Sequence, residues 1–487
     1  MKQKLFILLT VFTLFLVNIT ANPIDVKNVI EPSKGQPIKK FKLTAKEETL
    51  EIKKGLKIPV WTYNGTVPGQ EIRVTQGDFV EVELKNSLKV PITIHWHGYP
   101  VQNSMDGVTG LTQDSIKPGE TFIYKFSADI AGTYWYHSHE DSAKQLDKGL
   151  YGALIVEPKI KSKIDKDFTL ILDEWMENDN MDGMDMSMGS MNSMDMSSMN
   201  MDAKALEKSE EYMMATSYNI YTVNGKSGNL IEPLNVKKGD IVRLRFINAG
   251  YRSHSIHIPS QDIKIVATDG QDILNPPVIK DQIITIAPGE RYDIEFKVNG
   301  MDNFYIDFHD SNNFNDQIKI PVKISGGTNK FLLESSKRIF PLFDVYNYGK
   351  YEKGEFSLNQ EFDAEYNIEL GTKVVNNSLK YTLNGKTFEE LDPINVKTGD
   401  IIKLTYYNNT SVEHPMHIHG HFFEIVARNG IPLTGVRIVK DTILVKPYEK
   451  YTIIFKANNL GLWVQHCHEL HHAESGMMQE IVYTDYK

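Results

Sequence analysis

The chain has 487 residues, of which 41% are hydrophobic and 24% are charged. These are ordinary proportions for a globular protein, and the length allows three domains, or two with insertions, at the usual size of about 100–200 residues. The formal net charge of -10 argues against nucleic acid as a partner, because nucleic-acid recognition needs a basic surface.

The first 21 residues have the features of a secretory signal. Lys2 and Lys4 give a positive start, a short apolar run extends from Phe6 to Val17, and residues 19–21 end in a small side chain. The run is shorter than the roughly 20 residues that a membrane-spanning helix needs. We therefore expect residues 1–21 to direct export and to be cleaved, which leaves a protein without membrane contact. Because we find no motif for a lipid or wall anchor, we expect the periplasm as its location.

A pattern of two short strands around a Gly-Asp turn occurs three times. The turns are Gly77-Asp78, Gly239-Asp240 and Gly399-Asp400. An Asn-Gly pair, the strongest short signal for a β-hairpin, precedes each copy. Short alternating strands with regularly spaced turns are typical of β-sandwiches and barrels. We therefore predict an all-β protein of three tandem domains, at residues 40–160, 166–328 and 340–487.

One segment of the predicted second domain breaks this pattern. Residues 176–214 contain 12 of the 18 methionines, mixed with Asp, Ser, Asn and Gly, and Leu206 stands out as an aliphatic core residue. A segment of this composition cannot bury enough apolar surface to fold. We predict a disordered insertion.

Ten of the 15 histidines fall into four tight groups. The groups are His95 and His97; His137 and His139; His414, His417 and His419; and His466, His468 and His472. Residues i and i+2 of a strand point to the same face, so each His-x-His pair places two imidazoles side by side. Four such pairs exceed the four ligands of one structural zinc ion, and they suit a cluster of several metal ions.

The single cysteine, Cys467, stands between two histidines of the last group. In a strand it faces away from both, so one short strand joins two metal sites back to back. His472 and Met477 follow shortly afterwards, and His414 lies in the same domain. Two histidines, a thiolate and a weak axial methionine are the ligand set of a blue-copper centre.

Equivalent loops of the first and third domains carry the histidine groups. His95 and His417 each lie 17 residues after the aspartate of their Gly-Asp turn. Two such loops that face each other would enclose a metal site at the interface of these domains. The second domain lacks a His-x-His pair, and we expect its histidines to be structural. These are His254, His257 and His309.

With these four motifs in this order, the chain resembles the multicopper oxidases. This family includes laccases, ferroxidases and bacterial copper-efflux and copper-resistance oxidases. The resemblance covers all three repeats and implies three tandem cupredoxin-like Greek-key β-sandwich or barrel domains. It also implies an oxidoreductase that takes single electrons at a type 1 copper and reduces dioxygen to water at a three-copper cluster.

The resemblance further implies four copper ions per chain and their ligands. The type 1 ion would be bound by His414, Cys467, His472 and Met477. The type 2 ion would be bound by His95 and His417. One type 3 ion would be bound by His97, His137 and His468, and the other by His139, His419 and His466. Asp106 stands where the family often has an acid that helps to deliver protons. Ala473 replaces the acid that some bacterial members have after the last type 1 histidine, so we do not expect a proton relay at the neighbouring Glu474.

The methionine-rich segment points to cuprous copper as the electron donor. Thioethers are soft ligands that favour cuprous ions, and bacterial copper-efflux oxidases have comparable segments. The candidate donors for substrate copper are Met184, Met186, Met188, Met191, Met194, Met196 and Glu413. Two alternatives stay open: a laccase-like phenol oxidase or ferroxidase, and a copper-sequestering protein. In each case we expect a monomer.

Overall fold

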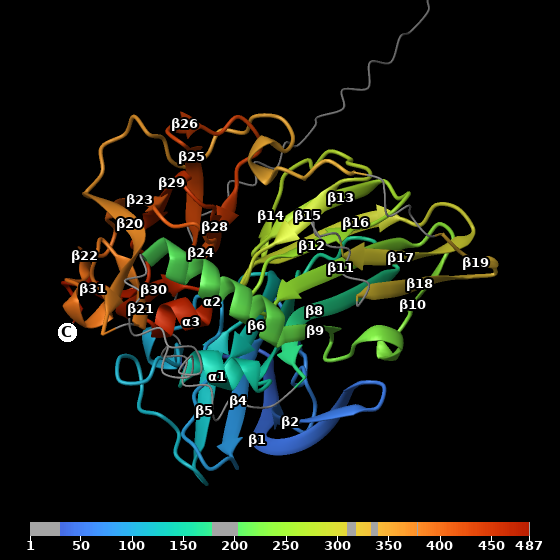
Figure 1. Cartoon of the computed structure of the whole chain (residues 1–487), viewed down its shortest axis with the longest axis horizontal. Helices are drawn as coiled ribbons and strands as arrows, with labels where there is room; N and C mark the ends of the chain where they lie inside the picture. Colours follow the sequence, from blue (N-terminus) through green and yellow to red (C-terminus); the bar gives the residue numbers. More distant parts are fainter. Residues whose placement is uncertain (1–29, 178–202, 309–317, 333–338, 377, 487) are drawn as a thin grey trace, which may run out of the picture.

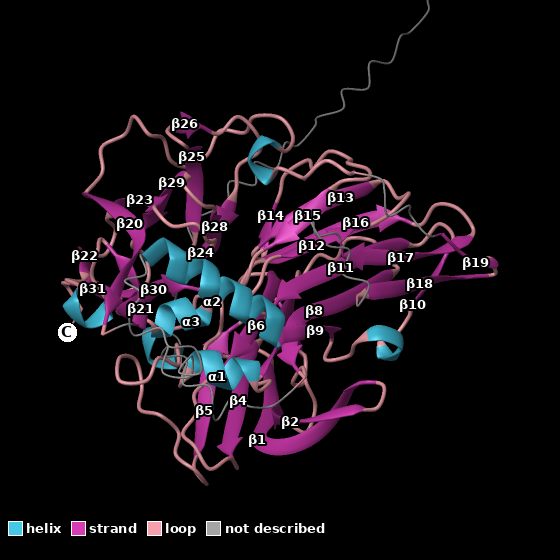
Figure 2. Cartoon of the chain, in the orientation of Figure 1, coloured by secondary structure: helices cyan, strands magenta, loops and turns pink. Residues whose placement is uncertain are grey.

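The computed structural model describes residues 30–177, 203–308, 318–332, 339–376 and 378–486. Strands dominate these residues, with three α-helices between them (Figure 2). The strands form three pairs of sheets, and each pair comes from one continuous stretch of chain (Figure 1). The prediction of a tandem all-β architecture is confirmed.

The first pair of sheets carries the first two histidine groups. One sheet has the order β2 (Leu56–Tyr63), β1 (Ile38–Lys53), β4 (Phe79–Asn86) and β5 (Thr121–Ser127), and the other has the order β3 (Ile72–Thr75), β7 (Tyr151–Glu157) and β6 (Gly132–His137). Alternate residues of β4, among them Val82 and Leu84, are fully buried, as the period of two requires. The strand β6 is buried on both faces and ends at His137.

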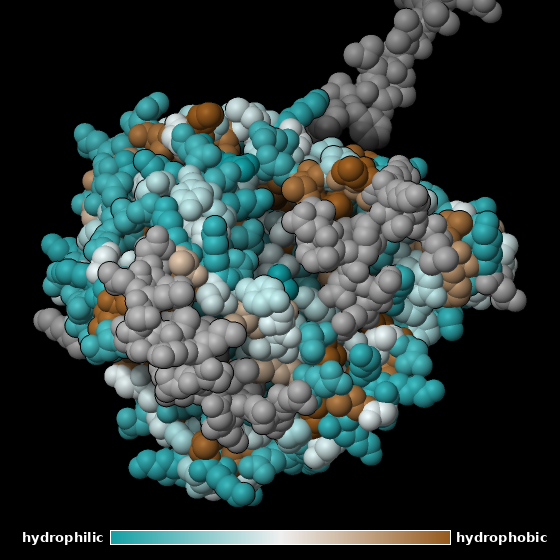
Figure 3. Space-filling view, in the orientation of Figure 1, coloured by the Kyte–Doolittle hydropathy of each residue, from teal (hydrophilic) through white to brown (hydrophobic). Residues whose placement is uncertain are grey.

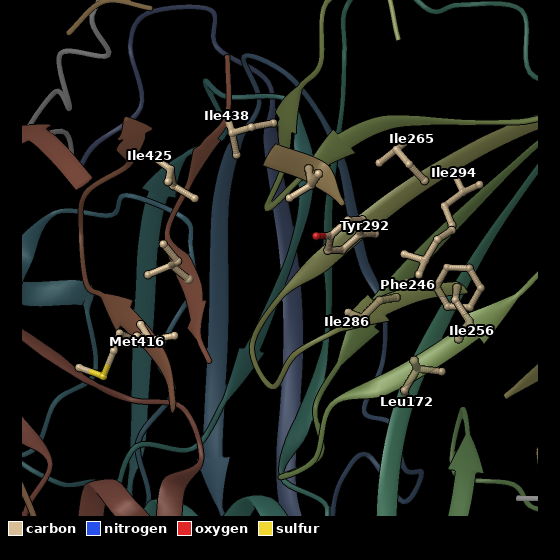
Figure 4. Close-up of a cluster of buried hydrophobic side chains, with 14 of the residues drawn as sticks. Leu172, Phe246, Ile256, Ile265, Ile286, Tyr292, Ile294, Met416, Ile425 and Ile438 are labelled. Carbon is tan, nitrogen blue, oxygen red and sulfur yellow. The ribbon is translucent and has the colours of Figure 1, made fainter. Parts of the chain in front are cut away.

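The second pair of sheets contains no predicted copper ligand. Its first sheet has the order β14 (Gln271–Asp272), β13 (Ile263–Thr268), β16 (Arg291–Lys297), β11 (Ile241–Asn248), β8 (Lys166–Met176) and β9 (Tyr218–Val223). Its second sheet has the order β10 (Leu234–Lys237), β18 (Lys319–Ser325), β17 (Asp302–Phe308), β12 (His254–His257) and β15 (Ile283–Ile286), and β19 (Thr328–Leu332) also pairs with β17. Phe246 and Ile256 lie between these sheets (Figure 4).

The third pair of sheets carries the other two histidine groups. One sheet has the order β21 (Ser378–Leu383), β20 (Ala364–Val375), β23 (Ile401–Asn408), β29 (Lys450–Lys456), β25 (Phe423–Arg428) and β26 (Ile431–Pro432), and β27 (Val439–Lys440) also pairs with β25. The other sheet has the order β22 (Ile394–Val396), β31 (Met478–Tyr483), β30 (Leu462–Cys467), β24 (His414–Ile418) and β28 (Thr442–Val445). Met416 packs in this core (Figure 4).

The described helices are α1 (Ser142–Asp147), α2 (Ala203–Ser217) and α3 (Leu470–Glu474). We expected residues 176–214 to lack regular structure. Residues 178–202 lie outside the described residues, but Met176 ends β8 and residues 203–214 belong to α2, so the expectation was wrong there. The sequence of α2 is rich in good helix formers, and Leu206, Glu207 and Met214 are buried along one face. Figure 1 shows α2 crossing in front of the second and third pairs of sheets.

Hydrophilic side chains cover most of the coloured surface on the face shown in Figure 3, and hydrophobic ones occur in small separate groups. Among the described residues, no helix is long and apolar enough to span a membrane.

Candidate metal centres

The strand β30 carries residues of two separate groups that could bind metal. It pairs with β24 in an antiparallel register that places Cys467 opposite Met416 and His466 opposite His417. Side chains alternate along a strand, so the thiol and the imidazole leave β30 on opposite faces. The predicted back-to-back arrangement therefore follows from the pleat of one strand.

The first group lies on the cysteine side of β30. The Sγ atom of Cys467 is 3.7 Å from Nδ1 of His414 and 3.7 Å from Nδ1 of His472. All three side chains are buried, and α3 presents His472. Met477 is also fully buried, and its carbonyl accepts a hydrogen bond of 3.1 Å from the amide of Cys467. The structure thus gathers the two histidines and the cysteine predicted for a blue-copper centre, with Met477 buried beside Cys467.

The other group contains eight imidazoles between the first and third pairs of sheets. These imidazoles form three sets of three, and within each set one nitrogen from every ring lies within 4.8 Å of the other two. The sets are His95, His97 and His417; His97, His137 and His468; and His139, His419 and His466. The structure therefore brings together every histidine that we predicted for the three-ion cluster, from four segments that are distant in the sequence.

In most of these rings one nitrogen is hydrogen-bonded to the protein. The other nitrogen is buried and has no hydrogen-bond partner in the described residues. Nδ1 of His137 and Nδ1 of His417 donate to the backbone carbonyls of Ser138 and Asp441, each at 2.9 Å. The unpartnered buried nitrogens include Nε2 of His95, His137, His139 and His417 and Nδ1 of His97. Burial of an unpaired polar atom is unfavourable, whereas a fixed tautomer with one free nitrogen is the arrangement of a metal-binding histidine. These residues fit bound copper.

Burial favours the neutral form of His97, His137, His139 and Cys467. Desolvation, followed by the neighbouring imidazoles, lowers the pKa of His97, His137 and His139 well below the ordinary value. Burial, then Glu469, raises the pKa of the Cys467 thiol. Neutral imidazoles are ready to bind a cation, but the thiol must lose its proton to become a ligand.

Two buried aspartates support the cluster. Nδ1 of His419 donates to Asp106 Oδ2 at 2.8 Å, and Nδ1 of His95 donates to the backbone carbonyl of Asp106 at 2.9 Å. Asp106 is the acid that the resemblance to the multicopper oxidases indicated. Sequence reasoning missed Asp441, which faces His97 and His417, because it lies outside every histidine motif and only the fold brings it to them.

The remaining histidines lie outside these groups. His254 Nε2 is 2.8 Å from Glu174 Oε1, and His257 lies between two aspartates. His421 donates to the carbonyl of His419 and accepts from the Tyr483 hydroxyl. These contacts agree with structural roles, and His309 lies outside the described residues. The Glu474 carboxylate accepts a hydrogen bond from the amide of Ala143.

A cavity of about 870 Å³ opens beside His472 and is lined by α2 and by the second and third pairs of sheets. Its acidic side chains are Glu210, Glu211, Glu413 and Glu469, and Met214 adds a thioether. Tyr381 also lines this cavity and contacts the candidate metal group. Its ring stacks on His472 with centroids 3.7 Å apart. We had named Glu413 from the sequence. We missed Glu210 and Glu211 because we expected no helix there.

Family models described as multicopper oxidase match residues 44–161, 166–324 and 358–487. Multicopper oxidase MmcO of Mycobacterium tuberculosis is 29% identical over 87% of this chain and 82% of its own length. Copper resistance protein A of Escherichia coli is 24% identical over 91% of this chain and 92% of its own. The crystal structure of Fet3p, a multicopper oxidase that functions in iron import, shares the fold with a TM-score of 0.76 at 22% identity, over 92% of this chain and 90% of that one.

Proposed function

Because this chain belongs to the multicopper oxidase family, we propose that its electron donor is cuprous copper, which it oxidises to the cupric form. The three β-sandwiches are the cupredoxin-like domains of that family, and the protein is an oxidoreductase that uses copper and passes electrons from a reducing substrate to dioxygen. Bound copper would supply the redox chemistry, accepting single electrons and delivering four of them to dioxygen to form water.

The proposal includes the ligands of four copper ions. The type 1 ion takes His414, Cys467, His472 and Met477. The type 2 ion takes His95 and His417, and the two type 3 ions take His97, His137 and His468, and His139, His419 and His466. The three imidazole sets and their unpartnered nitrogens support this distribution. The backbone and side chain of Cys467 then join the electron-accepting site to the cluster through its two neighbouring histidines. The Asp106 carboxylate lies 2.8 Å from Nδ1 of His419. It is therefore close enough to the cluster to support proton delivery.

The cavity beside His472 carries the proposal of a cuprous substrate. Carboxylates attract cations, and a thioether is a soft ligand that favours cuprous copper. Glu210, Glu211 and Met214 come from α2, and the methionine-rich segment joins α2 directly in the sequence. The segment's donors, Met184, Met186, Met188, Met191, Met194 and Met196, lie outside the described residues. We propose that they pass cuprous ions to the cavity.

Ferrous iron is the second candidate, because carboxylate oxygens are common ligands of ferrous iron and the cavity contains four carboxylates. Phenols are the third, since the cavity has the size of a small-molecule site. We further propose that residues 1–21 direct export to the periplasm and that the protein acts there as a monomer.

Oxygen uptake by the copper-loaded protein tests the substrate. Cuprous ion, ferrous ion and a phenol are compared in wild type, in a variant without residues 178–202, and in Glu210→Gln and Glu413→Gln. We expect each change to lower kcat/KM for cuprous ion by about tenfold, or about 1.4 kcal/mol, while phenol oxidation stays unchanged. Glu365→Gln, in an ion pair with Lys403 away from the cavity, is the matched control. Faster phenol oxidation with no effect of these changes on cuprous ion would overturn the proposal.

The acidity of Glu210 adds a second signature. Burial, then the nearby Glu469, raises the pKa of Glu210 to about 7, so its negative charge appears as the pH rises through neutrality. We expect kcat/KM for cuprous ion to rise over the same range in wild type and to lose this rise in Glu210→Gln.

A further inference from the structure

Arg291, at the start of β16, forms hydrogen bonds with all three sandwiches close to the imidazole cluster. Its side chain is fully buried. The guanidinium donates two hydrogen bonds to Asp441, of 2.7 and 2.6 Å, from the third sandwich. Its Nε donates to the backbone carbonyl of Thr133 in the first sandwich at 3.1 Å. Within the second sandwich it donates to the carbonyl of Gly289 at 3.1 Å.

Asp441, which these hydrogen bonds hold in place, contacts two imidazoles of the cluster. Its carbonyl accepts from Nδ1 of His417 at 2.9 Å, and its Oδ1 lies 3.3 Å from Nε2 of His97. The rings of His97 and His417 stack with centroids 3.8 Å apart and 15° between their planes. Both rings therefore rest against one aspartate, whose position depends on the two parallel hydrogen bonds from Arg291.

The packing leaves this pair little room to move. A Cβ atom on Gly98, the neighbour of His97, would lie 2.2 Å from Arg291 Nη2 and 2.3 Å from Asp441 Oδ2. Gly98 has a φ of +75°, a conformation that glycine adopts without strain. A planar guanidinium fits a carboxylate through two parallel hydrogen bonds, and a lysine ammonium cannot reproduce this geometry.

We propose that Arg291 is a positioning residue for the metal cluster, through which the second domain holds His97 and His417 in their ligand orientation. That domain supplies no proposed ligand of its own. Binding of the type 2 ion should depend most on Arg291, because only two histidines are proposed to bind this ion and His417 is one of them. The inference rests on the proposed ligand set.

The test measures the release of type 2 copper to a chelator, followed by electron paramagnetic resonance, in Arg291→Gln and Arg291→Lys. We expect both variants to keep the blue band of the type 1 copper and to bind type 2 copper about 10–100-fold more weakly, as for other residues that orient metal-binding histidines. Lysine keeps the charge but loses the parallel hydrogen bonds, so it should rescue stability more than copper binding.

Arg245→Gln is the matched control. Arg245 is also buried, pairs with Asp167 and Asp293 and donates to the Thr133 hydroxyl, but none of these partners contacts a proposed ligand among the described residues. It should lower stability and leave the type 2 signal unchanged. If the Arg291 variants release type 2 copper as wild type does, the inference is wrong; if glutamine prevents folding, the lysine variant decides by the same criterion. A wild type without a type 2 signal would instead refute the proposed ligand set.

Discussion

Cys467 is the residue at which the two candidate metal groups meet. Its thiol lies 3.7 Å from two imidazoles on one side of β30, and its chain neighbours His466 and His468 belong to the cluster on the other side. Because side chains alternate along a strand, His466 and Cys467 reach two different sites from adjacent positions, and His468 follows directly after the end of β30. A shift of one residue in the pairing of β30 with β24 would exchange the two faces and destroy both groups.

Replacement of Cys467 by serine tests this assignment. We expect Cys467→Ser to lose the intense blue absorption and about one copper ion per chain, because the thiolate is the soft ligand of a blue-copper site. The imidazole cluster should keep its copper, since no cysteine contributes to it. Visible absorption and copper analysis measure both effects, and the melting temperature shows that the fold is retained. An intense blue band in the variant would refute the type 1 assignment.

The helix α2 connects the methionine-rich part of the sequence with the cavity beside His472. Its residue Glu207 is buried and accepts hydrogen bonds from Thr372 and from the amide and hydroxyl of Ser411. These contacts fix α2 on the third sandwich, while Glu210 and Glu211, three and four residues later, face the cavity. A spacing of three to four residues places all three on one side of a helix.

Loss of the Glu207 anchor should disturb the cavity and leave the metal ligands unchanged. We expect Glu207→Ala to destabilise the protein by roughly 1–3 kcal/mol, because the partners of the carboxylate become buried without a hydrogen bond. kcat/KM for cuprous ion should fall, whereas the type 1 absorption should match wild type. Thermal unfolding and oxygen uptake measure the two effects. Lys208→Ala, at an exposed position of the same helix, should change neither, and equal effects in both variants would contradict the anchoring role.

The whole molecule places eight candidate imidazole ligands between the first and third sandwiches. Without metal, this arrangement collects neutral imidazoles at the cost of their solvation. The second sandwich separates the other two along the chain, and it reaches the cluster through Arg291. Copper binding and the association of the three domains are therefore coupled, because a ligand that binds only the folded state stabilises it.

This coupling predicts how the stability of the metal-free protein depends on pH. Burial lowers the pKa of His137, His414 and His466 below their value in the unfolded chain, so the unfolded state binds more protons at acid pH. The free energy of unfolding should then decrease as the pH falls below about 6.5. Calorimetry of the metal-free protein measures this slope, and added copper should raise the melting temperature at neutral pH. A flat profile in the metal-free protein would show that these imidazoles are not held neutral by burial.

The sequence by itself determined the all-β class, the repetition and the identity of the histidines and Cys467 that come together. These features are local: a period of two fixes which side chains share a face, and equal spacing after the Gly-Asp turns fixes which loops are equivalent. Asp106 was indicated by the resemblance to the multicopper oxidases and not by a local pattern.

Only the tertiary structure decided the surroundings of these ligands. Asp441, Arg291 and Tyr381 stand in no motif, and they reach the cluster or His472 from strands and loops that are distant in sequence. The helix α2 was also not predicted from the sequence. We assigned its residues to the methionine-rich segment that precedes it, and the composition of that segment obscured a short amphipathic pattern. Its stability comes from the burial of Leu206 and Glu207 against other elements. Contacts between distant segments depend on how the domains pack, and a local pattern carries no information about that packing.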